Sequence, residues 1–166
     1  MEQNSFIYKC STYMKLISAC LLGIKCEWDG KDRHKNDKAI ELLKNETLIP
    51  VCPEQLGGLK TPRAPQGIRR GTGADVLDKK CEVINENGEN VTQEFVRGAE
   101  ETLKIANLFH IKEFIGKSNS PSCGYGKIYD TTGKLIDGDG VTTALLKRDG
   151  IRVIREEDLH HLFDLR

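Results

Sequence analysis

The feature that most constrains the fold is an alternation of short apolar runs with amphipathic helical segments. The apolar runs have the length of strands, and turn-forming residues separate them from the helical patterns. Strands that alternate with helices favour a parallel, doubly wound α/β sheet. The predicted strands are 15–19, 47–51, 113–116 and 151–154, and the predicted helices are 38–44, 92–110, 140–148 and 156–163.

Local signals refine the ends of these elements. Pro50 weakens the prediction of the second strand, because proline cannot donate to a sheet ladder and belongs at an edge or an end. Asn36 or Asp37 is suited to cap the first helix, and Thr92 is suited to cap the long helix that follows it.

The remaining segments predict irregular structure. Residues 52–76 are dense in glycine and proline and have no sustained period, which indicates a long loop. An Asn-Gly pair within 81–90 predicts a small hairpin. No repeat or linker divides the chain, so we expect one domain over 14–166, a mostly parallel, Rossmann-like three-layer α/β sandwich. Residues 1–13 are expected to form a flexible N-terminal extension.

Composition and charge exclude several classes of protein. The chain has 25 Lys and Arg against 25 Asp and Glu, so its formal net charge is zero and it has no long-range attraction for a phosphate backbone. The longest apolar runs are about five residues, whereas a membrane span needs roughly 18. Residues 1–13 lack the basic start and apolar run of a secretory signal. These observations predict a cytoplasmic protein that does not enter membranes.

Three of the six cysteines follow predicted strands. Cys20 and Cys52 directly follow the first two predicted strands, and Cys123 lies in the loop that leaves strand 113–116. Cys26 shares a loop with Cys20. The carboxyl ends of parallel strands meet at one edge of a sheet, so we expect the three thiols to converge. A thiol cluster in a reducing compartment indicates a metal site rather than disulfides. The place of Cys26 in that site stays open, while Cys10 and Cys81 are interpreted as buried cysteines without a ligand role.

Two polar residues accompany the cysteines in these loops. Glu54 lies two positions beyond Cys52 and is a candidate proton donor or acceptor, with a solvated carboxylate as the alternative. Ser120 and Ser122 precede Cys123, and their hydroxyls either contact a substrate or cap a turn. No glycine-rich segment has a full phosphate-binding fingerprint, so no nucleotide cofactor is expected.

Seven separated motifs occur in an order that resembles a known family. They are Ser18-Ala19-Cys20-Leu21-Leu22-Gly23, Asp29-Gly30, Val51-Cys52-Pro53-Glu54, Leu56-Gly57-Gly58-Leu59 with Thr61-Pro62-Arg63, Ser120-Pro121-Ser122-Cys123-Gly124, Ile128-Tyr129-Asp130 and Gly138-Asp139-Gly140-Val141-Thr142. Together they resemble the 2-thiouracil desulfidase family over about residues 14–158.

The resemblance implies a cofactor and a reaction. It implies a 4Fe-4S cluster held by Cys20, Cys52 and Cys123 with the fourth iron open, a catalytic acid at Glu54 and a catalytic serine at Ser120. The implied reaction removes sulfur from a small thiolated pyrimidine without net redox change, with the open iron as a Lewis acid. Trp28 stands where relatives usually have tyrosine, which puts the substrate preference in question.

Three alternatives remain at the level of sequence. One is desulfuration of thiouridine in RNA, with Arg63, Arg69 and Arg70 contacting phosphates; RNA is the less favoured partner. The others are a zinc-stabilised binding module and an electron-transfer protein whose cluster is closed by Cys26 as a fourth ligand.

Overall fold

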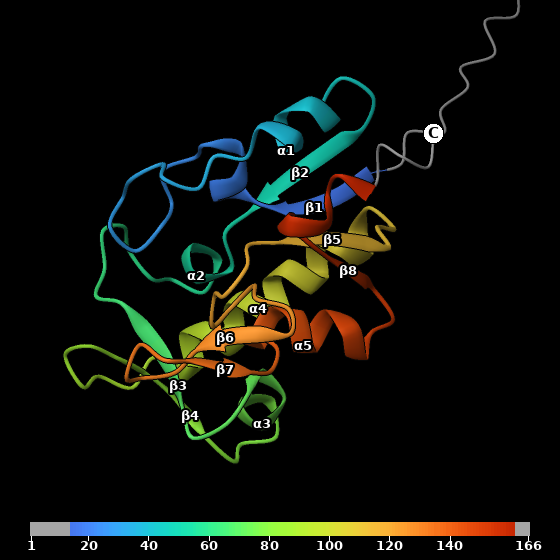
Figure 1. Cartoon of the computed structure of the whole chain (residues 1–166). Coiled ribbons are helices and arrows are strands. Elements are labelled where there is room, and N and C mark those ends of the chain that lie inside the picture. The colour runs from blue at the N-terminus through green and yellow to red at the C-terminus, as the bar shows by residue number, and fades with distance from the viewer. Residues whose placement is uncertain (1–13, 162–166) are drawn as a thin grey trace, which may run out of the picture.

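The computed structural model describes residues 14–161, and its centre is a four-stranded parallel sheet in the order β2-β1-β5-β8 (Figure 1). The strands are β1 (Met14–Ser18), β2 (Thr47–Val51), β5 (Glu113–Gly116) and β8 (Arg152–Arg155). The α/β fold class with a Rossmann-like sheet that the sequence predicts is therefore confirmed. Pro50 lies on β2, which is an edge strand of the sheet. This position suits proline, which has no N–H to donate to a second neighbouring strand.

Helices cover both faces of the sheet: α1 (Asp37–Leu42) lies on one face, and α4 (Thr92–Leu108) and α5 (Val141–Arg148) lie on the other (Figure 1). Neighbouring residues of β1 point to opposite faces, so Ile17 packs in the apolar cluster of α1 and Leu16 in that of α4 and α5. Both side chains are fully buried, which gives the three layers their two cores.

Smaller elements pack together on the other side of α4. Phe95 and Ala99 of α4 share a third apolar core with residues of these elements. The elements are two antiparallel ribbons, β3 (Gln66–Arg69) with β4 (Glu82–Asn85) and β6 (Lys127–Tyr129) with β7 (Leu135–Asp137), and the short helix α3 (Gly73–Leu77). No helix within the described residues is long and apolar enough to cross a membrane.

The prediction of an unbroken loop over 52–76 is wrong. This segment contains the helix α2 (Pro53–Leu56), strand β3 and helix α3. Each element has only four or five residues, too few to show a hydrophobic period, and tertiary packing stabilises them. The predicted hairpin 81–90 is only partly formed, because β4 takes β3 as its ladder partner and meets Asn90 through a single bridge.

Capping was predicted correctly at one helix and incorrectly at another. The Asn36 side chain accepts the backbone N–H groups of Lys38 and Ala39 at the start of α1. The Thr92 hydroxyl instead accepts the N–H of Val83 in β4, so it does not cap α4. Within the predicted last helix, 156–163, residues Glu156–Asp158 form a 3-10 turn, η2. Residues 162 and 163 lie outside the described part of the chain. The predicted extension 1–13 also lies outside it.

Candidate active site

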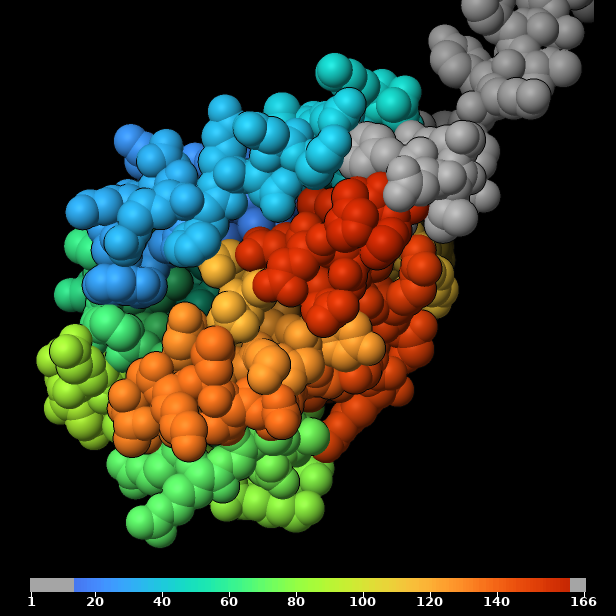
Figure 2. Space-filling model, in the orientation of Figure 1, coloured from blue at the N-terminus to red at the C-terminus, as the bar shows by residue number. Residues whose placement is uncertain are grey.

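A cavity of about 860 Å³ opens beside the carboxyl ends of β1, β2 and β5. In the sheet, β2 lies on one side of β1 and β5 lies on the other side, so the strand order reverses at β1. Parallel α/β sheets form their binding sites at the carboxyl ends of the strands that flank such a switch point. Residues 18–34 and 117–133 contribute much of the lining. Figure 2 shows the blue segment near residues 20–36 and the amber and orange segments around 117–133 on one face of the molecule.

All three cysteines of the strand-end prediction line this cavity. Cys20 lies in the 3-10 helix η1 (Ala19–Leu22) that directly follows β1, and Cys52 follows β2 and is the N-cap residue of α2. Cys123 is buried in the loop that leaves β5. The structure therefore brings together thiols that are far apart in the sequence, as parallel neighbouring strands require.

Cys26 is a fourth thiol in the same cavity. Its side chain is buried in one apolar core with Cys20, and Cys52 packs against that core. Hydrogen bonding to Cys20 and burial raise the pKa of Cys26 to about 12. Contact with Cys26, burial and the Glu54 carboxylate also raise the pKa of Cys52. The thiols of Cys26 and Cys52 are thus held in their protonated form at neutral pH.

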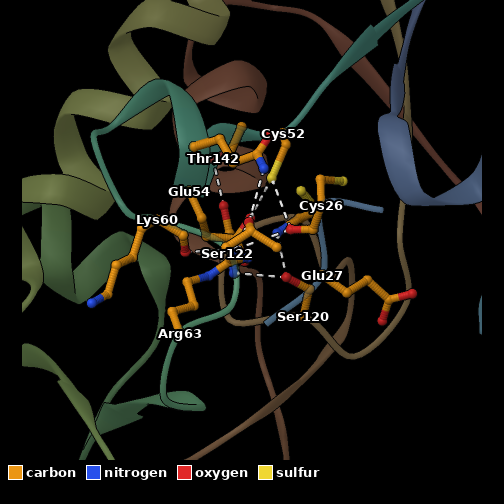
Figure 3. Close-up of polar contacts among 12 residues, drawn as sticks. Cys26, Glu27, Cys52, Glu54, Lys60, Arg63, Ser120, Ser122 and Thr142 are labelled. Atoms are coloured by element: carbon orange, nitrogen blue, oxygen red, sulfur yellow. Dashed lines mark hydrogen bonds and ion pairs between the residues drawn. The ribbon is translucent and has the colours of Figure 1, made fainter. Parts of the chain in front are cut away.

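Glu54 points toward the same group of residues from the first turn of α2 (Figure 3). One carboxylate oxygen lies 3.6 Å from Nη2 of Arg63, and the other accepts a hydrogen bond from Cys52 Sγ at 3.6 Å. The Arg63 side chain is only 5% exposed and that of Glu54 13%. Burial of Cys123 raises the pKa of its thiol, and the nearby Glu54 charge raises it further.

Arg63 is a site residue whose role the sequence did not reveal. Its Nη1 donates to the carbonyl oxygen of Cys26 at 3.0 Å and to Thr61 Oγ1 at 3.0 Å, while its backbone N–H donates to the Trp28 carbonyl at 2.7 Å. Arg63 thus ties the loop after β1 to the segment that carries Glu54. The Thr-Pro-Arg motif marked the residue, but its burial depends on a loop distant in sequence.

Ser120 lines the cavity and caps the loop at the same time. Its Oγ accepts the backbone N–H groups of Ser122 and Cys123, each at 3.1 Å. These two bonds use both lone pairs of the hydroxyl and leave its O–H free to donate. The capping role and the substrate-contact role that the sequence left as alternatives are therefore compatible.

The Ser120–Cys123 loop is fixed against the start of α5. Ser122 is buried and its hydroxyl shares a hydrogen bond of 3.0 Å with that of Thr142 (Figure 3). The Thr143 hydroxyl donates to the carbonyl oxygen of Cys123 at 2.8 Å. At the β1 end, the Ser18 hydroxyl accepts the N–H of Lys117 at 3.0 Å, so the ends of β1 and β5 are also joined.

Other candidates from the sequence lie apart from this centre. Arg69 and Arg70 line a second cavity with Cys81, so they do not form one phosphate-binding surface with buried Arg63. All four histidines are exposed. His34 reaches the rim of the main cavity, where its Nδ1 lies 2.6 Å from Glu27 Oε2.

The donor set suits an iron–sulfur cluster. In residues 14–161 no three His, Cys, Asp or Glu side chains are spaced to hold a single metal ion. A cluster places its thiolates on different irons, so its ligands surround a volume and do not converge on one point. Three thiols from three strand ends around one cavity match the cluster arrangement better than a tetrahedral zinc site.

Comparison with known proteins agrees with this geometry. The sequence model of the family described as 2-thiouracil desulfurase matches residues 16–158. The chain belongs to the 2-thiouracil desulfurase family. YbbK of Bacillus subtilis (strain 168), described as an uncharacterized protein, is 44% identical to this family member over 151 residues, which are 90% of this chain and 99% of YbbK.

A solved structure in the same family supports the fold. The [4Fe-4S]-dependent thiouracil desulfidase TudS is 36% identical, with a TM-score of 0.76, and the match covers 93% of this chain and all of the TudS chain. The predicted resemblance to the desulfidase family, stated from seven motifs, is confirmed by these matches.

Proposed function

We propose that the protein is an iron–sulfur-dependent desulfidase that replaces the sulfur of a thiolated pyrimidine, such as 2-thiouracil, with oxygen from water. The observation that carries this proposal is the convergence of Cys20, Cys52 and Cys123 on one cavity that Glu54 also lines. Family membership and the likeness to a [4Fe-4S]-dependent thiouracil desulfidase support it. The cavity volume lies in the range of small-molecule sites, about 300–1,000 Å³.

The three cysteines would hold a 4Fe-4S cluster through their thiolates. When bound, the cluster supplies an iron without a protein ligand, a Lewis acid that makes a thiocarbonyl carbon more electrophilic. The thiols must lose their protons to bind iron, and burial beside Glu54 opposes that loss at Cys52 and Cys123. Assembly of the site is therefore coupled to proton release.

Glu54 handles the protons of the reaction. Its carboxylate accepts a proton from the attacking water and returns one to the departing sulfur, so that thiouracil and water give uracil and hydrogen sulfide with no net transfer of electrons. Arg63 restrains the Glu54 side chain through the ion pair of 3.6 Å and keeps it at the wall of the cavity.

Ser120 acts as a hydrogen-bond donor. Because its lone pairs already accept two backbone N–H groups, the hydroxyl is a poor base, but its proton is available to a developing negative charge on the substrate. The geometry favours a small substrate over RNA, since Arg63 is buried and Arg69 and Arg70 face a different cavity.

The experiment is an anaerobic reconstitution of the cluster followed by addition of 2-thiouracil without any reductant. We expect uracil and sulfide in equal amounts, and no product from Cys123→Ala. A spectroscopically intact cluster that releases neither product would contradict the proposal. A colourless, zinc-loaded protein that fails to take up iron would support the binding-module alternative.

A further inference from the structure

Cys26 is a buried thiol at the site that the proposed function does not use. Its side chain is only 2% exposed and lies in one apolar core with Cys20, and Cys52 packs against that core. A free cysteine in such a position is ordinarily a small apolar filler. Here the thiol also lines the cavity that would hold the cluster, close to two proposed iron ligands.

The loop between Cys20 and Cys26 turns back on itself and brings the two thiols together. Gly23 ends η1 in the left-handed conformation, with φ of 82°, and its N–H donates to the Cys20 carbonyl at 3.0 Å. A side chain at this φ would be strained, so glycine permits the reversal. The N–H of Ile24 then donates to the Ala19 carbonyl at 3.3 Å, which closes the turn.

The backbone of Cys26 is fixed against the segment that carries Cys52. Its carbonyl oxygen accepts hydrogen bonds from Arg63 Nη1 at 3.0 Å and from Cys52 Sγ at 3.6 Å (Figure 3). Its N–H donates to the Ile24 carbonyl at 2.8 Å. With the main chain held in this way, the side chain stays in the apolar core that it shares with Cys20 and Cys52, and its sulfur would be available to an iron held by either.

Cys123 is held in different surroundings. Its side chain is buried in the other apolar core of the sheet, with Leu16 of β1 and Val51 of β2. Cys26 therefore shares an apolar core with Cys20 and packs near Cys52, whereas Cys123 belongs to a different core.

We propose that Cys26 is an alternative iron ligand that can take the place of Cys20 or of Cys52, but not of Cys123. The exchange is redox-neutral. Cys26 gives up its thiol proton as its sulfur binds the iron, and the thiolate that it replaces accepts a proton. The proposal rests on the cluster of the proposed function, but it concerns cluster retention and not the desulfidase reaction.

The test measures iron and acid-labile sulfide per chain after anaerobic reconstitution, together with the visible absorbance of the cluster. Cys20→Ala and Cys52→Ala should each retain a cluster, whereas Cys20→Ala/Cys26→Ala and Cys52→Ala/Cys26→Ala should lose it. Cys123→Ala should lose it although Cys26 is present. Cys26→Ala alone should keep the full iron content, because all three primary ligands remain.

Cys81 provides the matched control, since it lines the second cavity and packs against the third apolar core, apart from the cores that contain Cys20, Cys26 and Cys123. Cys20→Ala/Cys81→Ala should keep as much iron as Cys20→Ala. Thermal unfolding of each apo variant verifies that it is folded, and valine replacements, which cannot bind iron, repeat the comparison if an alanine variant does not fold.

Two results would overturn the proposal. One is equal iron content in each single variant and its Cys26→Ala double variant, which is the behaviour of an apolar filler. The other is retention of the cluster in Cys123→Ala to the same extent as in Cys20→Ala. Because iron content is the readout, a protein that binds its cluster but does not release sulfide would contradict the proposed function and leave this comparison valid.

Discussion

Substitution of Gly98 by alanine tests whether α2 must pack tightly on α4 for the site to work. A Cβ at Gly98 would lie 1.9 Å from the carbonyl oxygen of Pro53, and real Cβ contacts essentially never fall below 3.0 Å. The backbone at Pro53 must therefore retreat by about 1 Å. Pro53 stands between Cys52 and Glu54, so both side chains move with it.

The expected effects on stability and on activity can be separated. In an ordinary helix interior, glycine to alanine stabilises by about 1 kcal/mol. Here overpacking, which costs about 1–3 kcal/mol, should reverse that sign and give a net loss of stability. A displacement of about 1 Å at catalytic groups can lower the rate about 100-fold. We expect a comparable fall in kcat/KM for 2-thiouracil.

The assay compares Gly98→Ala with Glu100→Ala, an alanine substitution at an exposed position of the same helix. Denaturant unfolding of the apo proteins gives the stability, and kcat/KM is normalised to the iron content of each preparation. Glu100→Ala should change stability by less than about 0.5 kcal/mol. A Gly98→Ala protein as stable and as active as wild type would refute the argument that close helix packing sets the position of Glu54.

Three further predictions concern the residues of the cavity. Glu54→Gln should keep the cluster but lower kcat by about 10²–10⁴-fold, because the amide cannot transfer protons; loss of iron in parallel with activity would instead assign Glu54 to cluster binding. Ser120→Ala should lower the unfolding free energy by about 1–3 kcal/mol in denaturant melts, because two loop N–H groups lose their acceptor, and an unchanged midpoint would contradict this. The apo protein should lose stability as pH rises from about 9 toward 12, because the pKa of Cys26 is raised from 9.0 to about 12 on folding and the unfolded chain ionises first. The Cys26→Ala protein should lose less stability than wild type over this pH range. If the melting temperatures of wild type and Cys26→Ala depend on pH in the same way, Cys26 is not the cause of the loss.

The sequence contains enough information to predict the sheet and the meeting of the cysteines. The four strands have clear apolar patterns, and the rule that parallel strands end at one edge places Cys20, Cys52 and Cys123 together without any knowledge of side-chain contacts. Pro50 weakened the strand pattern of 47–51, but proline is tolerated there because β2 is an edge strand.

Other features could not be predicted because they depend on tertiary contacts. The helix α2 has only four residues, and close packing against α4 fixes its position. Gly57, at the end of α2, closely approaches the backbone of α4, and Gly98 of α4 closely approaches the backbone of α2. Arg63 looked like part of a basic surface patch, yet the loop after β1 buries it against Glu54. The proximity of Cys26 to Cys52 likewise depends on a loop reversal at Gly23 that no periodic pattern reveals.

The central claim is that this chain hydrolyses a carbon–sulfur bond at a cluster-bearing cavity without electron transfer. A single-turnover reaction of reconstituted protein with 2-thiouracil in ¹⁸O-labelled water, without any electron donor, tests it most directly. The account predicts one sulfide for each uracil and ¹⁸O at the carbon that carried sulfur. Uracil without the label, or turnover only when a reductant is supplied, would contradict it.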